Sequence, residues 1–177
     1  MRTFPAFGAF DSRFPGLYAN LQTYGLPYPE AIFELDYFRQ TPAPFYKLCS
    51  DLWPGRYHPT VTHHFLRLLH DKGALLRCYT QNIDSLESAA GLPTDSLVAA
   101  HGNFDTASVV GGASVPIEEV RAAALDGSVE AWSALNARYG GLVKPDIVFL
   151  GERCVLCGER CVLCGKRCVL CCERCVL

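Results

Sequence analysis

The strongest hydrophobic pattern in this sequence is a helix that leads into an apolar strand. Residues 60–70 place apolar side chains at intervals of three and four, which is one face of a helix. The apolar positions on that face are Val61, Phe65, Leu68 and Leu69. Gly73 ends the helix, and the mainly apolar run 74–80 that follows is typical of a buried strand. A helix followed by such a strand indicates an α/β fold.

Weaker patterns predict the remaining elements on either side of this pair. Apolar spacing and proline or glycine boundaries indicate further helices at 30–38, 42–52 and 85–90, and strands at 97–100 and 142–150. Pro145 restricts part of the last strand to a sheet edge, because proline has no N–H to donate. We expect 74–80 and 145–150 to be neighbours in one parallel sheet, with helix 60–70 packed on it.

Residues 103–141 differ from the segments around them. Two glycine pairs, at 111–112 and 140–141, enclose a segment of lower apolar density that contains alanine and glutamate at helical spacing. We expect helices near 117–125 and around Trp132. The pattern predicts a small module inserted into the α/β domain.

Composition narrows the class of protein without identifying it. The 177 residues are 50% hydrophobic, which is enough to bury a core, and the formal net charge is −2. A near-neutral chain lacks the basic surface that nucleic-acid binding requires. No apolar run reaches the 18 or more residues typical of a membrane helix, and Pro5 interrupts the start where a signal peptide would be apolar. We therefore expect an intracellular protein, cytoplasmic or nuclear, with neither nucleic acid nor a membrane as partner.

Cysteine is concentrated in a repeat at 153–177. Of the 10 cysteines, eight lie in near-identical units of seven residues, Arg-Cys-Val-Leu-Cys-Gly-Glu in the first copy. The unit is too short for a solenoid repeat, and copies this similar are typical of an expanded DNA repeat or of an out-of-frame reading. The alternative is metal binding, because the repeat contains Cys-x-x-Cys pairs. We treat 153–177 as a tail separate from the domain at 1–152.

Polar side chains with catalytic potential follow the first predicted strand. Gln81, Asn82 and Asp84 come where strand 74–80 ends, and His101 follows the strand at 97–100. Ligands of open α/β sheets bind at the carboxyl ends of strands, where amides orient hydroxyl groups and histidine moves protons near neutral pH. The alternative is that Asn82 and Asp84 only cap the helix at 85–90.

The segment Cys78-Tyr79-Thr80-Gln81-Asn82-Ile83-Asp84-Ser85-Leu86-Glu87, followed by Ala100-His101-Gly102, resembles the sirtuins, the NAD-dependent protein lysine deacylases. The stretches Leu26-Pro27-Tyr28-Pro29-Glu30-Ala31-Ile32-Phe33 and Leu142-Val143-Lys144-Pro145-Asp146-Ile147-Val148-Phe149 are similar to the eukaryotic class I members. The resemblance runs in order through 16–152. It implies a partial Rossmann-like parallel sheet with a small inserted module.

The resemblance also assigns roles to residues. It implies that His101 is the general base acting on the nicotinamide-ribose hydroxyls, and that Gln81, Asn82 and Asp84 hold the ribose and the carboxamide of NAD. The implied substrate is an acetylated protein or peptide, which pairs as an added strand with Val148, Phe149, Gly151 and Glu152. The implied reaction transfers the acetyl group of acetyl-lysine to ADP-ribose and releases nicotinamide. The alternative is an inactive fragment that only binds a peptide or a partner.

The chain departs from the sirtuin pattern in three places. Near its start, Asp11 and Arg13 match the family's Asp and Arg, while the preceding strand and Gly-rich phosphate loop have no counterpart. The family's structural zinc is held by four cysteines, and residues of other types stand at the matching positions, so we expect no zinc there. Those positions are Val109, Gly112, Asn136 and Tyr139. After Glu152 the cysteine repeat replaces the family's later segments, so we expect a sirtuin truncated at both ends.

Overall fold

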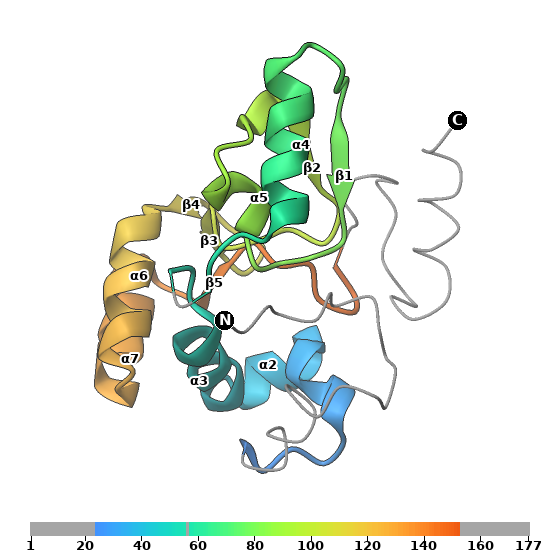
Figure 1. Ribbon diagram of the computed structural model, residues 1–177. Coiled ribbons are helices and arrows are strands. Elements are labelled where there is room, and N and C mark those ends of the chain that lie inside the picture. Colours follow the sequence, from blue (N-terminus) through green and yellow to red (C-terminus); the bar gives the residue numbers. More distant parts are fainter. Residues whose placement is uncertain (1–23, 56, 153–177) are drawn as a thin grey trace.

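The first of two units in the structure is built on a pair of parallel strands (Figure 1). The structure is a computed structural model that describes residues 24–55 and 57–152. Strand β1 (Cys78–Thr80) pairs in parallel with β2 (Leu97–Ala99). Helix α5 (Leu86–Ala89) and the 3-10 helix η3 (Thr94–Ser96) form the crossover between them. This parallel unit confirms the α/β class.

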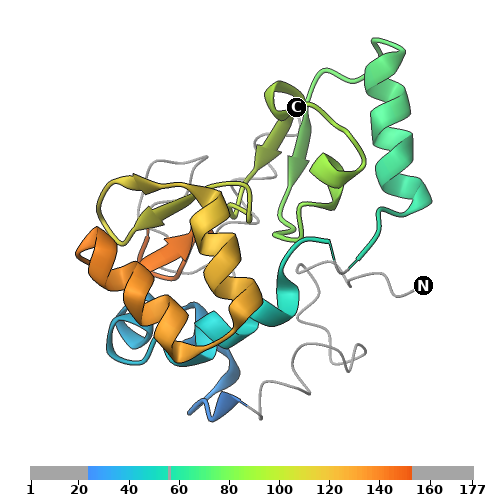
Figure 2. The same ribbon diagram turned by 90° about the vertical axis from the view of Figure 1, so that its left-hand side faces the viewer.

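Helix α4 (Val61–Asp71) precedes β1 and begins as its sequence predicts. The Thr60 hydroxyl shares a contact of 2.8 Å with Nδ1 of His63, and the Thr60 amide donates to the same nitrogen at 3.1 Å. These contacts cap the first turn. The expected packing of α4 on the sheet is wrong: Val61, Phe65 and Leu68 are 86%, 54% and 50% exposed. Figure 2 shows why, since α4 stands at the outer edge of the molecule.

The second unit contains an antiparallel sheet covered by helices. Its strand order is β4-β3-β5, with β3 (Ala107–Val109) central between β4 (Ser114–Val115) and β5 (Val143–Pro145). Helices α6 (Ile117–Asp126) and α7 (Val129–Tyr139) lie side by side against it (Figures 1 and 2). Pro145 ends an edge strand, as expected. Strand β5 completes this sheet, so the sheet extends past residue 141. The module boundary at 141 remains a prediction.

Two further helices and a cluster of aromatic rings complete this second unit, which we call the packed body. After the 3-10 helix η2 (Pro29–Phe33), helix α2 (Leu35–Gln40) and helix α3 (Ala43–Leu52) supply rings that meet Phe149 from the chain after β5. The Phe149 ring centroid lies 4.7 Å from that of Phe45 and 5.4 Å from that of Phe38. Tyr46 stacks on Trp132 of α7 at 4.0 Å. The rings therefore join α2, α3 and α7 into one core.

The predicted pairing of 74–80 with 145–150 is wrong. Residues 97–99 occupy the place beside β1, whereas β5 pairs antiparallel with β3 in the other sheet. Residues 146–150 form no regular strand, because three of their amides donate to three separate segments. Those bonds are Asp146 N to Thr106 O at 2.9 Å, Val148 N to His101 O at 2.9 Å and Leu150 N to Phe33 O at 2.8 Å. Over the described residues, no helix is both long and apolar enough to cross a bilayer.

Candidate functional site

The candidate site lies where the two parallel strands end. The Ala100 amide donates to the Thr80 carbonyl at 2.8 Å, so the chain beyond β1 and the chain beyond β2 leave the sheet side by side. Thr80 Oγ1 then accepts from the Asn82 amide at 3.1 Å and fixes the turn after β1. Gln81 and Asn82 on one side and His101 on the other are thereby brought to one edge, as the sequence predicts.

Burial favours the neutral imidazole form of His101, and one of its ring nitrogens has no partner among the described residues. Burial lowers the pKa of its ring below the ordinary 6.5, and a hydrogen bond with the Gln81 backbone acts in the opposite direction. A bond that raises the pKa of histidine is one that the ring donates, so we place the proton on Nδ1. Nε2 is buried and has no hydrogen-bond partner within the described part of the chain. Its lone pair is therefore free to accept a proton.

Asp84 combines a structural contact with a perturbed carboxyl group. Its Oδ1 accepts from the Leu86 amide at 3.1 Å, which begins α5 and agrees with the capping alternative. Burial raises the pKa of Asp84, and the capping bond opposes that rise. A carboxylate has about four lone-pair sites, so this contact leaves acceptor capacity for a ligand. The capping role and a binding role are compatible.

Ser85, next to Asp84, is in a conformation that costs free energy. Within the described residues it is the one non-glycine with positive φ, at 56°. Its hydroxyl is also buried without a described hydrogen-bond partner. Strained backbone and unpaired buried polar atoms concentrate at functional sites, and Ser85 shows both.

The turn that carries His101 packs closely against the chain after β5. Gly102 has φ of +69°, and a Cβ there would lie 1.7 Å from the Asp146 carbonyl oxygen. Only glycine fits this approach. The Val148 amide donates to the His101 carbonyl at 2.9 Å and adds a second tie. The sequence gives no signal for the Gly102 contact, because it depends on two segments that meet only in the fold.

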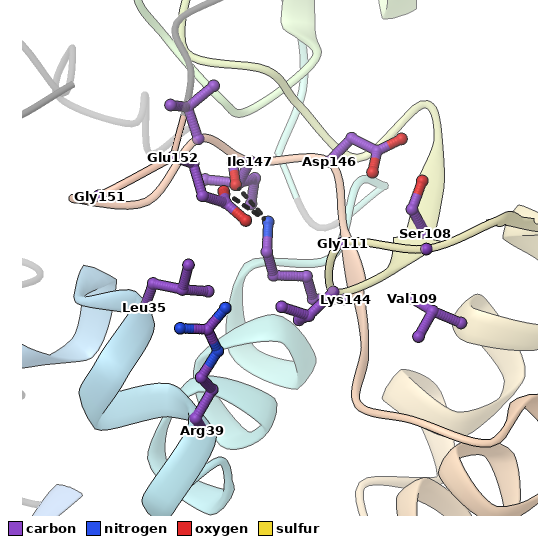
Figure 3. A pocket seen from close by; sticks show the side chains of 13 residues that line it. Leu35, Arg39, Ser108, Val109, Gly111, Lys144, Asp146, Ile147, Gly151 and Glu152 are labelled. Atoms are coloured by element: carbon purple, nitrogen blue, oxygen red, sulfur yellow. Dashed lines mark hydrogen bonds and ion pairs between the residues drawn. The ribbon is translucent and has the colours of Figure 1, made fainter. Parts of the chain in front are cut away.

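A cavity of about 460 Å³ lies between α2, the β3–β4 hairpin and residues 144–152 (Figure 3). Three of the four proposed substrate residues line it, namely Val148, Gly151 and Glu152. The fourth, Phe149, faces the other way and is 0% exposed in the aromatic core. The structure therefore separates Phe149 from the other three.

Lys144 is the charged residue that sequence reasoning missed. Its side chain is 5% exposed, and its Nζ donates to Glu152 Oε2 at 3.0 Å and to the Ile147 carbonyl at 2.7 Å. Figure 3 shows the ammonium pointing toward both groups. The sequence does contain a signal for this residue, namely a lysine inside the apolar run 142–150. Lysine is rarely buried without a partner, so its place in such a run indicates a buried ion pair.

The positions that match the family's zinc cysteines carry no thiolate, and the described contacts of Val109 and Asn136 are with neighbouring protein groups. Val109 fills the space beside Gly141, where an added Cβ would lie 2.7 Å from Val109 Cγ1. Asn136 Oδ1 accepts from Tyr46 Oη at 3.1 Å and from the Val143 amide at 2.9 Å. Across residues 24–55 and 57–152, no three His, Cys, Asp or Glu side chains group as metal ligands. An aliphatic group and an amide do not fit a zinc–thiolate centre.

Two predicted features lie outside the described residues. They are the proposed cofactor contacts Asp11 and Arg13, and the cysteine repeat at 153–177.

Comparisons with known proteins agree with the resemblance seen in the sequence. The family model described as "Sir2 family" matches residues 6–168. Over 149 residues the chain is 53% identical to the NAD-dependent protein deacetylase sirtuin-3 of Mus musculus, covering 82% of this chain and 43% of that protein. It is 47% identical to the NAD-dependent protein deacetylase hst2 of Schizosaccharomyces pombe, over 83% of this chain and 44% of that protein. The chain thus spans less than half the length of these relatives.

Proposed function

Because this chain belongs to the Sir2 family, we propose that it is an NAD-dependent protein lysine deacetylase. The reaction moves the acetyl group of acetyl-lysine to ADP-ribose and releases nicotinamide. The observation that carries the proposal is the buried Nε2 of His101, which has no hydrogen-bond partner among the described residues, at the sheet edge where Gln81 and Asn82 also lie. We take the reaction class from the relatives, which are named NAD-dependent protein deacetylases.

The described residues fit the ribose end of the cofactor. NAD, when bound, supplies an ADP-ribosyl group with nicotinamide as its leaving group. His101 accepts a proton at Nε2 from a hydroxyl held within hydrogen-bond distance, and Nδ1 keeps its proton through the contact with the Gln81 backbone. Asn82 and Asp84 orient that hydroxyl and the carboxamide. Asp11 and Arg13 remain proposed cofactor contacts on the strength of the resemblance.

The proposed substrate is an acetylated protein or peptide that lies along residues 148–152. Val148, Gly151 and Glu152 line the cavity between α2, the β3–β4 hairpin and residues 144–152, which supports their assignment to peptide binding. The Val148 amide already donates to the His101 carbonyl, so a peptide strand would bind to the remaining backbone groups. Phe149 supports this segment from the core rather than touching the peptide.

Nicotinamide release from NAD with an acetylated peptide tests the proposal. We expect release by the full chain, and loss of at least about 100-fold in His101→Gln, because general-base catalysis contributes that much. His64→Gln is the matched control, since His64 is exposed on α4. No release above the rate without protein would contradict the proposal and favour the inactive-fragment alternative. Equal release by His101→Gln and the full chain would remove His101 as the base.

We propose further that the module formed by β3, β4, α6 and α7 is held together without zinc. Side-chain packing by Val109 and the two hydrogen bonds to Asn136 Oδ1 support this, because they join β3, α7, α3 and β5 at the matching positions. We expect a chelator to leave the Tm of the full chain unchanged. A fall in Tm that persists after deletion of residues 153–177 would show that the module holds metal by another route.

We also propose an intracellular location, cytoplasmic or nuclear. The two cysteines in the described part of the chain, Cys49 and Cys78, are free thiols, as is typical of proteins in reducing compartments. The formal net charge of −2 gives no reason to propose nucleic acid as a partner, and we propose no membrane partner.

A further inference from the structure

We propose that Lys144 is a positioning residue for His101, acting through the peptide bond between Ile147 and Val148. The carbonyl of that peptide accepts from Lys144 Nζ at 2.7 Å, and its N–H donates to the His101 carbonyl at 2.9 Å. The importance of this link for catalysis rests on the proposed function. The link itself is a property of the free protein.

The ammonium of Lys144 has little freedom to move. Its three partners are the Ile147 carbonyl, the Pro145 carbonyl at 3.4 Å and Glu152 Oε2 at 3.0 Å, which matches the three protons of an ammonium group. Nζ also lies 4.5 Å from the ring centroid of Phe149, at cation–π distance. Residues 145–152 thus supply four contacts to one cation, and Figure 3 shows those with Ile147 and Glu152.

Glu152 completes the arrangement by balancing the buried charge. Its Oε2 accepts from Lys144 and also from the Phe149 amide at 2.9 Å. A charge this deeply buried is tolerated only when it is paired and hydrogen-bonded. The ion pair therefore closes the turn between Phe149 and Glu152 and keeps Lys144 in place.

One peptide unit carries the restraint from the lysine to the histidine. The carbonyl and the N–H at opposite sides of a planar peptide move together, so fixing the Ile147 oxygen also fixes the direction of the Val148 N–H. That N–H donates to the backbone carbonyl of His101. The Asp146 carbonyl packs against Gly102 with no room for a Cβ, so the His101 turn follows the same segment.

The test is the titration of His101 by NMR in the full chain without NAD or peptide. The variant is the double substitution Lys144→Met and Glu152→Gln, which removes both charges, keeps similar shapes and leaves no unpaired buried charge. Because the net charge is unchanged, no change in the total charge of the protein contributes to the shift in the titration. The His101 signal is identified by its loss in His101→Gln.

We expect the pKa of His101 to rise toward 6.5 in the double variant, because a loosened turn admits water to the ring. Hydrogen exchange at the Val148 amide should accelerate as well. Val120→Ala is the control, since Val120 is 0% exposed on α6 and its truncation lowers Tm through a cavity. In that control we expect neither the pKa of His101 nor the Val148 exchange to change.

An unchanged pKa of His101 and unchanged Val148 exchange in a folded double variant would overturn the proposal. If the double variant does not fold, Lys144→Arg alone decides, because it keeps the charge pair with Glu152 and alters the donor to the Ile147 carbonyl: a smaller rise in the pKa supports the link, and no rise overturns it. Neither measurement uses NAD, so a chain that releases no nicotinamide would refute the proposed function and leave this result intact.

Discussion

The two sheets of this molecule differ in how firmly they are packed. In the packed body all three residues of β5 are buried, and α3 buries five of its side chains. In the parallel unit, Tyr79 of β1 is 44% exposed and α4 has no buried residue. The candidate catalytic residues follow the strands of the parallel unit, so they belong to the less firmly packed of the two.

This difference in packing indicates which part of the molecule restrains the candidate site. Segments with few buried apolar contacts open at lower free energy than a core does. The His101 turn nevertheless contacts the packed body twice, where Gly102 meets the Asp146 carbonyl and where Val148 donates to His101. The parallel unit carries the candidate catalytic groups, and the packed body contacts the turn that holds His101.

The largest effect is expected from truncating a core ring in the packed body. Phe149→Ala should lower the free energy of unfolding by about 3–5 kcal/mol, because it leaves a cavity among Phe33, Phe38 and Phe45. Chemical denaturation measures this change.

Phe65→Ala on α4 is the matched substitution in the parallel unit. We expect a loss within about 0.5 kcal/mol, since Phe65 is 54% exposed. Equal losses for the two variants would mean that the two units do not differ in packing.

A smaller effect is expected where the two units meet. Gly102→Ala should cost about 3 kcal/mol, because the new Cβ collides with the Asp146 carbonyl oxygen and the left-handed backbone disfavours alanine. Gly73→Ala is the control, since Gly73 has φ of +66° and open space around it. That control should cost about 1 kcal/mol by backbone strain alone. If both substitutions had the same effect on unfolding, the close contact at Gly102 would be excluded.

The smallest effect is a gain in stability at the site. Ser85→Gly should raise the free energy of unfolding by about 1 kcal/mol, because glycine adopts the positive φ freely and carries no unpaired hydroxyl. Ser85→Ala removes the hydroxyl and keeps the backbone strain, so it should gain less. A loss of stability in Ser85→Gly would show that the hydroxyl has a partner.

Much of the fold follows from local sequence signals. The helices at 43–52, 61–71 and 86–89 and the strand at 97–99 agree with the spacing of apolar residues and with their proline and glycine boundaries. The class of fold and the gathering of His101 with Gln81 at one sheet edge were also predictable. These features depend on neighbouring residues and on the rule that places ligands at strand ends.

The two wrong predictions, the pairing of 145–150 and the packing of α4, share a physical cause. The apolar run 142–150 reads as one strand, yet its backbone bonds are divided between β3 and three other segments. The apolar face of α4 reads as a buried surface, and its burial depends on what packs against it. Strand pairing and helix packing are set by partners distant in sequence, which a single sequence does not reveal. The same holds for Lys144, whose role depends on residues that the fold brings to it.

The pH dependence of nicotinamide release by the full chain, with NAD and an acetylated peptide, tests the central claim most directly. Burial depresses the pKa of His101 below 6.5, so the ring stays unprotonated and active as the pH falls through 6.5, and it protonates only at the lower folded value. We therefore expect release to decline on the acid side with an apparent pKa below 6.5. A decline with an apparent pKa above 6.5, or release that His101→Gln leaves unchanged, would contradict the account of His101 as a neutral base held in place by the packed body.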